Sequence, residues 1–325
     1  MFNRKNLFFI VLLKFFAVIL ITNSHYGSIY PISSIATGGM IGNLIFLSVS
    51  GYTLFNIKDN FVKWYTKRIT RIYPSLFVVM SIFVIFGIFS ISSLDNFISL
   101  FIFPTYYHFI ASIVLLYIVF YIIFQIHFFH KNPEYVLFLT ILMKLITYIF
   151  FYDKSYYHVD VVEESFIRFL FFEAMVIGAI LRKNSKIMSS NNSLLVFVFG
   201  TIVYLFTKIS FDNALLHMNL QILNQFTLLI LIIGLLDFIY SLKSYLQKLP
   251  SIIQNTINFV STLTLEIYFV QYLVFRISFL MNMIFPLNFL LVSLSILGGA
   301  FLVFVFVESI KLIPIFIRFH RKKTV

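Results

Sequence analysis

The 325-residue chain has no cysteine and very little charge, and both absences restrict what it can be. Without cysteine there is no disulfide framework, no thiolate nucleophile and no thiolate metal site, so any catalysis must use oxygen or nitrogen groups. Charged residues make up only 11% of the chain, whereas they are about 25% of an ordinary soluble domain. The scarcity of charge therefore excludes a soluble globular domain.

Apolar residues take the place of charge. They make up 61% of the chain, including 44 Phe, and the mean hydropathy is +0.99. Since a transmembrane helix needs about 20 apolar residues, the sequence predicts an all-α, multi-pass membrane protein with ten transmembrane helices. No connection is long enough for a soluble domain, so residues 1–325 are expected to form one membrane domain. The predicted spans are residues 7–23, 38–55, 73–91, 98–127, 135–152, 166–181, 194–210, 219–240, 256–279 and 287–308.

The net charge of +12 is distributed unevenly along the chain. Lys and Arg gather in every second connection, whereas the alternate connections contain one basic residue, Lys154, and several carboxylates. Because cytoplasmic loops are rich in Lys and Arg, we expect both termini on the cytoplasmic side and an even number of spans. Nucleic-acid binding is not indicated, because the basic residues lie between apolar segments.

The segment KRITRIYP at residues 67–74 is the sharpest local signal. Arg68 and Arg71 are three residues apart and share one face of a helix. Guanidinium groups bind phosphate bidentately and keep their charge, so the pair predicts a site for a nucleotide with several phosphates. Tyr73 suits the level of the lipid headgroups and Pro74 the first turn of the next helix. The alternative is that these basic residues only fix the topology.

His25 is the candidate catalytic base. It follows Lys14 by eleven residues, about 16 Å along a helix, and imidazole is the side chain best suited to proton transfer near neutral pH. Lys14 lies inside the first predicted span, where a charge is costly and usually functional. A histidine that merely forms hydrogen bonds at the membrane interface is the alternative.

The second predicted span, GGMIGNLIFLSVSGY at residues 38–52, contains small residues that permit close helix packing or a narrow tunnel. It closes with Ser50, Gly51 and Tyr52. Three further charges, on Lys144, Glu173 and Glu266, lie inside predicted spans. Such groups normally face the interior of a helix bundle and pair with one another, so we expect pairing there at least as much as catalysis.

Together these elements resemble the opening of the membrane acyltransferase-3 family, whose members move acyl groups from acyl-coenzyme A to sugars and other hydroxyls across a membrane. The R-x-x-R-I-Y-P form at residues 68–74 matches the family motif without substitution, and residues 50–52 resemble its Ser-Gly-Phe signature. FVESIKLIP at residues 306–314, which includes Glu308, resembles the end of the last span. Two positions depart from the pattern: Lys14 replaces an arginine and Gln271 a histidine.

The resemblance implies an O-acyltransferase, in the first place an O-acetyltransferase, of a bacterial inner membrane. Acetyl-coenzyme A, or another acyl-coenzyme A, would be the cytoplasmic donor, and the acceptor would be a hydroxyl of a surface polysaccharide (capsule, exopolysaccharide or lipopolysaccharide) or of its lipid-linked precursor. No metal is expected. Coenzyme A would bind Arg68, Arg71, Lys14 and Tyr73, His25 would accept the proton, and Ser50, Gly51, Tyr52 and Glu308 would shape the tunnel.

Two alternatives to this function stay open. A transporter or flippase of a glycan or small solute would also need many spans and buried charges, but it would not need coenzyme A. A polysaccharide polymerase usually has a large outward loop, which the connections here are too short to form. Within the acyltransferase reading, a transient acyl-histidine is the alternative to direct transfer.

Overall fold

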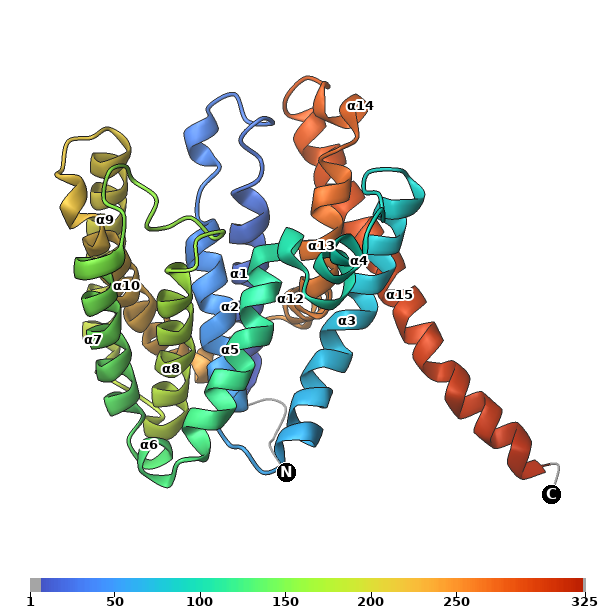
Figure 1. Cartoon of the computed structure of the whole chain (residues 1–325), viewed down its shortest axis with the longest axis horizontal. Coiled ribbons are helices and arrows are strands. Elements are labelled where there is room, and N and C mark those ends of the chain that lie inside the picture. Colours follow the sequence, from blue (N-terminus) through green and yellow to red (C-terminus); the bar gives the residue numbers. More distant parts are fainter. Residues whose placement is uncertain (1–6, 324–325) are drawn as a thin grey trace.

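The computed structural model describes residues 7–323, with side chains as far as Lys311, and this part of the chain contains helices and no strand (Figure 1). The main helices are α1 (Phe8–Asn23), α2 (Gly39–Leu54), α3 (Phe61–Ile85), α5 (His108–Gln125), α7 (Pro133–Phe151), α8 (Ile167–Asn184), α9 (Ser190–Asp212), α10 (Ile222–Ser241), α12 (Ser251–Thr262), α13 (Thr264–Val274) and α15 (Leu287–Lys323). Short helices lie in the connections: α4 (Leu94–Phe97), α6 (His127–Lys131), α11 (Lys243–Leu246) and α14 (Ser278–Met281).

The all-α, multi-pass prediction is confirmed in its main feature. Seven of the described helices are long and apolar enough to cross a membrane, or eight if one bent pair counts as a single span. All ten predicted segments are helical, but α1 has only 16 residues. Helix α8 carries four charges: Arg168 near its start, Glu173 in its middle, and Arg182 and Lys183 in its last turn. The count of ten spans therefore stays a prediction.

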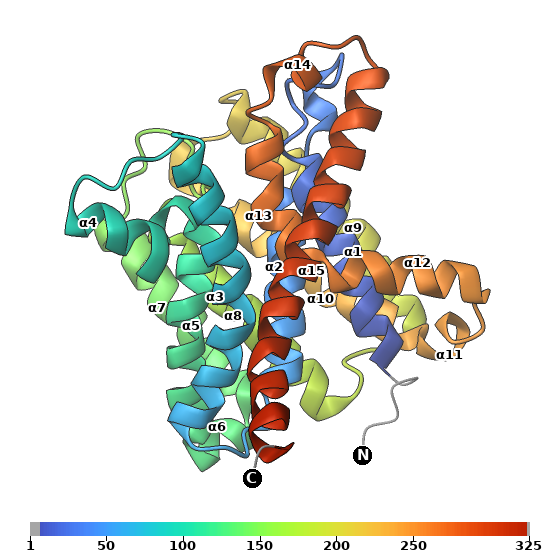
Figure 2. The ribbon, with the colours of Figure 1, turned by 90° about the vertical axis from the view of Figure 1, so that its right-hand side faces the viewer.

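The two ends of the bundle differ in charge. The start of α3 lies at the same end of the bundle as α6, and basic residues surround it: Lys58 precedes the helix and Lys63 lies in its first turn (Figure 1). The acidic connection between α7 and α8 lies toward the end marked by α14 (Figure 1). The first turn of α1 and the last turns of α15 both lie toward the α6 end (Figure 2). This arrangement agrees with an even number of crossings; which end faces the cytoplasm stays a prediction.

Helix α3 begins earlier than predicted. The Asn60 side chain caps it by accepting a hydrogen bond from the Lys63 amide at 3.0 Å, and the helix continues through Pro74 to Ile85. The expectation that Pro74 occupies a first helical turn is therefore wrong. Because the helix already exists at residue 61, Arg68 and Arg71 project from a rigid helix rather than from a loop.

The predicted span at 256–279 is broken. Helices α12 and α13 meet at an angle of 65° around Leu263, and α12 runs across the bundle (Figure 2). Threonines flank the break: the Thr262 hydroxyl donates to the Asn258 carbonyl at 2.8 Å and the Thr264 hydroxyl to the Ser261 carbonyl at 2.7 Å. Such side-chain bonds compete with the backbone ladder and bend helices. The bend brings polar groups into the bundle.

Helices α2 and α8 pack backbone against backbone. A Cβ atom on Gly51 would lie 1.8 Å from the Met175 carbonyl oxygen, and one on Gly178 would lie 1.9 Å from the Ser48 carbonyl oxygen. No side chain fits at either place, so both glycines are required by helix packing. On α8, Glu173 also forms a fully buried ion pair with Lys144 of α7 at 2.6 Å, which confirms the expected pairing of these two charges.

Candidate functional site

A cavity of about 580 Å³ contains most of the predicted phosphate-binding residues. We call it the cation cavity. Five basic side chains line it, against two carboxylates: Lys14, Lys67, Arg68, Arg71 and Lys311, with Glu266 and Glu308. The excess of positive charge suits a guest that carries several negative charges.

Arg68 and Arg71 present their guanidinium groups to the cation cavity from α3. Arg68 is held by Trp64: its Nη1 donates to the Trp64 carbonyl at 2.6 Å, and its Cζ lies 4.4 Å from the centre of the indole ring. Trp64, the one tryptophan of the chain, is almost fully buried. Sequence reasoning missed this support, although Trp64 lies one helical turn before Arg68. A positioned guanidinium loses little entropy when it binds phosphate.

The two arginines are available to an anionic guest. Among the residues that the structure describes, no carboxylate lies within ion-pair distance of Arg68 or Arg71. Lys67, by contrast, pairs with Asp59 at 2.6 Å, and hydrogen bonds from Lys67 and Lys63 hold the pKa of Asp59 below its usual value. The pair leaves Lys67 less able than the arginines to attract an anion.

The broken helix completes one wall of the cation cavity. It contributes hydroxyl and amide groups on both sides of the bend: Asn258, Ser261 and Thr262 of α12, and Thr264 of α13. Glu266, on the same wall, accepts a hydrogen bond from the Ser75 hydroxyl at 2.7 Å. This side of the cavity could not be predicted from the sequence, because residues 256–279 are apolar enough to be taken for one span.

The remaining predicted residues separate into two groups. Ser50 and Glu308 line the cation cavity, and Glu308 is paired with Lys311 at 2.7 Å. Gly51, Tyr52 and Tyr73 do not line it: Gly51 packs against α8, Tyr52 accepts a hydrogen bond from Arg182 at 3.2 Å, and the Tyr73 hydroxyl donates to the Ile102 carbonyl. Their positions give no support to a tunnel-lining or phosphate-binding role for these three residues.

His25 lines a second cavity of about 570 Å³, which we call the histidine cavity. The residue lies in the turn that follows α1, and its Nε2 is 3.4 Å from the Tyr272 hydroxyl of α13. Burial lowers the pKa of His25 below its ordinary value of 6.5. The imidazole is therefore neutral at pH 7 and can accept a proton.

Asn43 of α2 also lines the histidine cavity, and sequence reasoning did not select it. Its side chain is buried, and its Oδ1 has no hydrogen-bond partner in the structure. A buried amide oxygen without a partner is costly. The position of Asn43 in the lining leaves its Oδ1 as an available hydrogen-bond acceptor beside the cavity.

Four helices, α1, α2, α5 and α13, contribute residues to the lining of both cavities. Residues three, four or seven apart on a helix share one face, so a single face of each helix passes from one cavity to the other. The linings meet where Phe46, from the cation cavity, contacts Phe109, from the histidine cavity, edge to face with 5.9 Å between ring centres. The paired contributions are Lys14 and Ile21 of α1, Ser50 and Asn43 of α2, Ile113 and Phe109 of α5, and Thr264 and Tyr268 of α13.

The comparison with known proteins agrees with the motifs. A family model described as an acyltransferase domain matches residues 7–308, and the chain therefore belongs to the acyltransferase-3 family. It is a membrane acyltransferase by family. Neither the curated proteins nor the solved structures gave a match. Within residues 7–311, whose side chains the structure describes, no group of three or more His, Asp or Glu residues is arranged to hold a metal ion.

Proposed function

We propose that the protein transfers an acyl group, in the first place acetyl, from acyl-coenzyme A in the cation cavity to a sugar hydroxyl in the histidine cavity. The cation cavity would face the cytoplasm of a bacterial cell, and the acceptor would be a surface polysaccharide or its lipid-linked precursor. The observation that carries the proposal is that four helices contribute both to a cavity rich in basic side chains and to the cavity that contains His25.

The donor end of the reaction rests on Arg68, Arg71 and Lys14. Coenzyme A carries phosphates at one end and a thioester at the other, joined by a narrow pantetheine arm. With the phosphates on the guanidinium groups, the arm would follow the shared helix faces past Phe46 and Phe109 toward His25. These two rings are in edge-to-face contact, so they would have to turn aside when the arm enters.

The acceptor end of the reaction rests on His25. The imidazole takes the proton from the acceptor hydroxyl while that oxygen forms a bond to the thioester carbonyl carbon. The carbon–sulfur bond then breaks, and the coenzyme A thiolate leaves with the electron pair. The Tyr272 hydroxyl, 3.4 Å from Nε2 of His25, is close enough to donate a hydrogen bond to the carbonyl oxygen as its negative charge develops.

The test is release of the coenzyme A thiol by purified protein, measured with a thiol reagent. The chain contains no cysteine, so the protein itself adds no background. We expect acetyl-coenzyme A to lose its acetyl group when an acceptor glycan is added, and His25→Ala to abolish this release at unchanged coenzyme A affinity. Export or flipping of a glycan without any thiol release would instead support the transporter alternative.

A further inference from the structure

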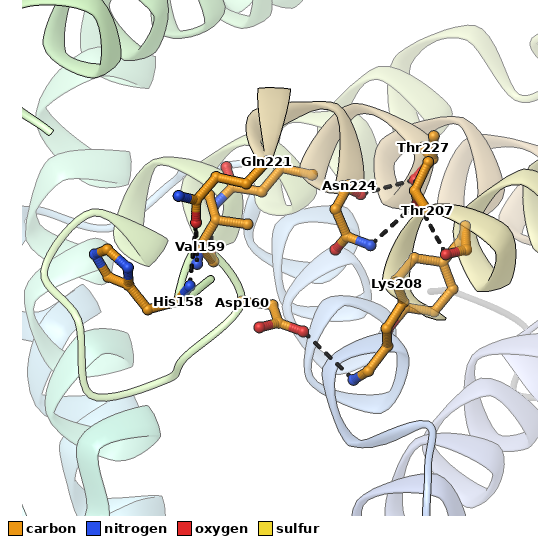
Figure 3. A network of polar contacts seen from close by, with 10 residues as sticks. His158, Val159, Asp160, Thr207, Lys208, Gln221, Asn224 and Thr227 are labelled. Atoms are coloured by element: carbon orange, nitrogen blue, oxygen red, sulfur yellow. Dashed lines mark hydrogen bonds and ion pairs between the residues drawn. The ribbon is translucent and has the colours of Figure 1, made fainter. Parts of the chain in front are cut away.

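The connection between α7 and α8, residues 152–166, is fixed to the start of α10 by two buried glutamines. Oε1 of Gln221 accepts hydrogen bonds from the His158 and Val159 amides, each at 3.1 Å, and Nε2 of Gln225 donates to the Val159 carbonyl at 2.7 Å (Figure 3). Both glutamines are inaccessible to solvent. These bonds fix the middle of the connection against α10, and we call the fixed segment that continues through Asp160 to Glu163 the wall.

This wall brings charged groups into the histidine cavity. Asp160 and Glu163 line the cavity on one side, and Lys208 of α9 lines it next to them. Oδ2 of Asp160 lies 3.4 Å from Nζ of Lys208 (Figure 3), and Oε1 of Glu163 lies 4.0 Å from Nε2 of His108.

We propose that this wall is the acceptor subsite and that it takes a neutral sugar. The inference rests on the proposed function and adds the charge class of the acceptor. Carboxylates accept hydrogen bonds from sugar hydroxyls, Lys208 donates them, and the rings of Tyr268 and Tyr272 offer flat apolar surfaces to a pyranose face. The unpaired Oδ1 of Asn43, in the same lining, can accept one more.

The charge of the lining decides against an acidic sugar. Counting Asp, Glu, Lys and Arg among the described residues that line the histidine cavity, there are two carboxylates and one ammonium group. The ammonium group of Lys208 already faces Asp160. A uronic acid or a phosphorylated sugar would therefore bring a further negative charge to a cavity with no unopposed lysine or arginine, and like charges at close range repel.

The test compares sugars that differ at C6, where one carries a hydroxymethyl group and the other a carboxylate. Thiol release from acetyl-coenzyme A by the purified protein is measured with methyl glucoside, methyl galactoside and their 6-carboxylate counterparts as acceptors. At least one neutral glycoside should raise release above the rate with water, and its acidic counterpart should be at least tenfold weaker in kcat/KM. Equal or better use of the acidic sugars, or no stimulation by any neutral glycoside, would overturn the assignment.

A variant with increased activity toward the acidic sugar distinguishes sugar recognition by the wall from a purely structural role. The double variant Asp160→Asn, Glu163→Gln removes both negative charges of the wall, and we expect it to raise kcat/KM for the acidic glycoside at least fivefold with KM for acetyl-coenzyme A unchanged. Glu134→Gln, which breaks an ion pair with Lys183 at 3.0 Å outside both cavities, is the control and should change neither sugar.

The outcomes distinguish the two proposals. Equal loss with both sugars in the double variant, together with a lower unfolding temperature, would show that the wall only supports the fold and would overturn the subsite. His25-dependent thiol release without discrimination between neutral and acidic sugars would also overturn the subsite while leaving the proposed function standing. No His25-dependent release with any acceptor would refute the proposed function itself.

Discussion

Arg71→Ala should weaken coenzyme A binding without harming the fold. Arg71 faces the cation cavity, is exposed, and has no carboxylate partner among the described residues, so its removal leaves no buried charge unpaired. The loss of one charge-assisted contact to phosphate costs about 1.5–3 kcal/mol, which corresponds to a roughly 10- to 150-fold increase in Kd. Because solvent reaches Arg71, we expect the lower part of that range.

Arg68→Ala should cost more than Arg71→Ala. Arg68 is already positioned by the Trp64 carbonyl and indole ring, so its contact to phosphate is formed with less loss of side-chain freedom. Arg68→Lys should recover only part of the loss, since an ammonium group cannot form the two parallel hydrogen bonds of a guanidinium. The comparison tests geometry and not only charge.

Isothermal titration of purified protein with coenzyme A measures these changes. Lys63→Ala is the matched control, because Lys63 also lies on α3 but does not line the cation cavity. Unfolding temperatures of all variants should agree with the parent, which excludes a general effect on folding. Parent-like affinity in both Arg68→Ala and Arg71→Ala would refute the assignment of this cavity to the donor phosphates.

Four further outcomes are expected. His25→Ala and His25→Gln should each reduce the rate of acyl transfer by about 10²–10⁴. Because burial lowers the pKa of His25, kcat/KM of the parent should stay high at pH 7 and fall only as the pH drops through a value below 6.5. A fall in kcat/KM that begins above pH 6.5 would contradict a neutral base. Gly178→Ala should lower the free energy of unfolding by about 1–3 kcal/mol or more, because its Cβ would meet the Ser48 backbone, whereas Gly298→Ala, with open space around it, should be tolerated. Glu173→Ala should destabilise the protein by about 3–5 kcal/mol by stranding a fully buried lysine, and a thermal melt like that of the parent would refute this. A cysteine introduced at position 28 should react with an impermeant maleimide from outside intact cells and one at position 60 should not; the reverse pattern would invert the topology.

The sequence was most informative where the signal is local. Apolar runs predicted the helical segments because each run is long enough to form a helix without help from distant residues. Arg68 and Arg71 could be paired because helical spacing alone places them on one face. The N-terminal limit of α3 was also within reach, since Asn60 is a typical cap, but the basic residues that follow it reduce the hydropathy and hide the helix.

Other features depend on contacts between distant residues. The break at Leu263 follows from two threonine hydroxyls that bond to their own backbone, which an apolar composition conceals. The wall that carries Asp160 is fixed by Gln221, 61 positions away along the chain, so its place beside His25 could not be derived from either segment. Tyr73 does not line the cation cavity, and its hydroxyl donates to the Ile102 carbonyl, a contact between residues 29 positions apart that the motif does not reveal.

In the proposed reaction, the contact between Phe46 and Phe109 would also help to preserve the proton gradient across the membrane. A permanent passage that connects two aqueous compartments would let protons run down their gradient, whatever else it carried. The two rings touch edge to face, and a pantetheine arm that moved them apart would occupy the space it opened. In the proposed reaction the bound substrate would itself block the opening, so that acyl transfer across the bilayer would not be accompanied by an ion leak.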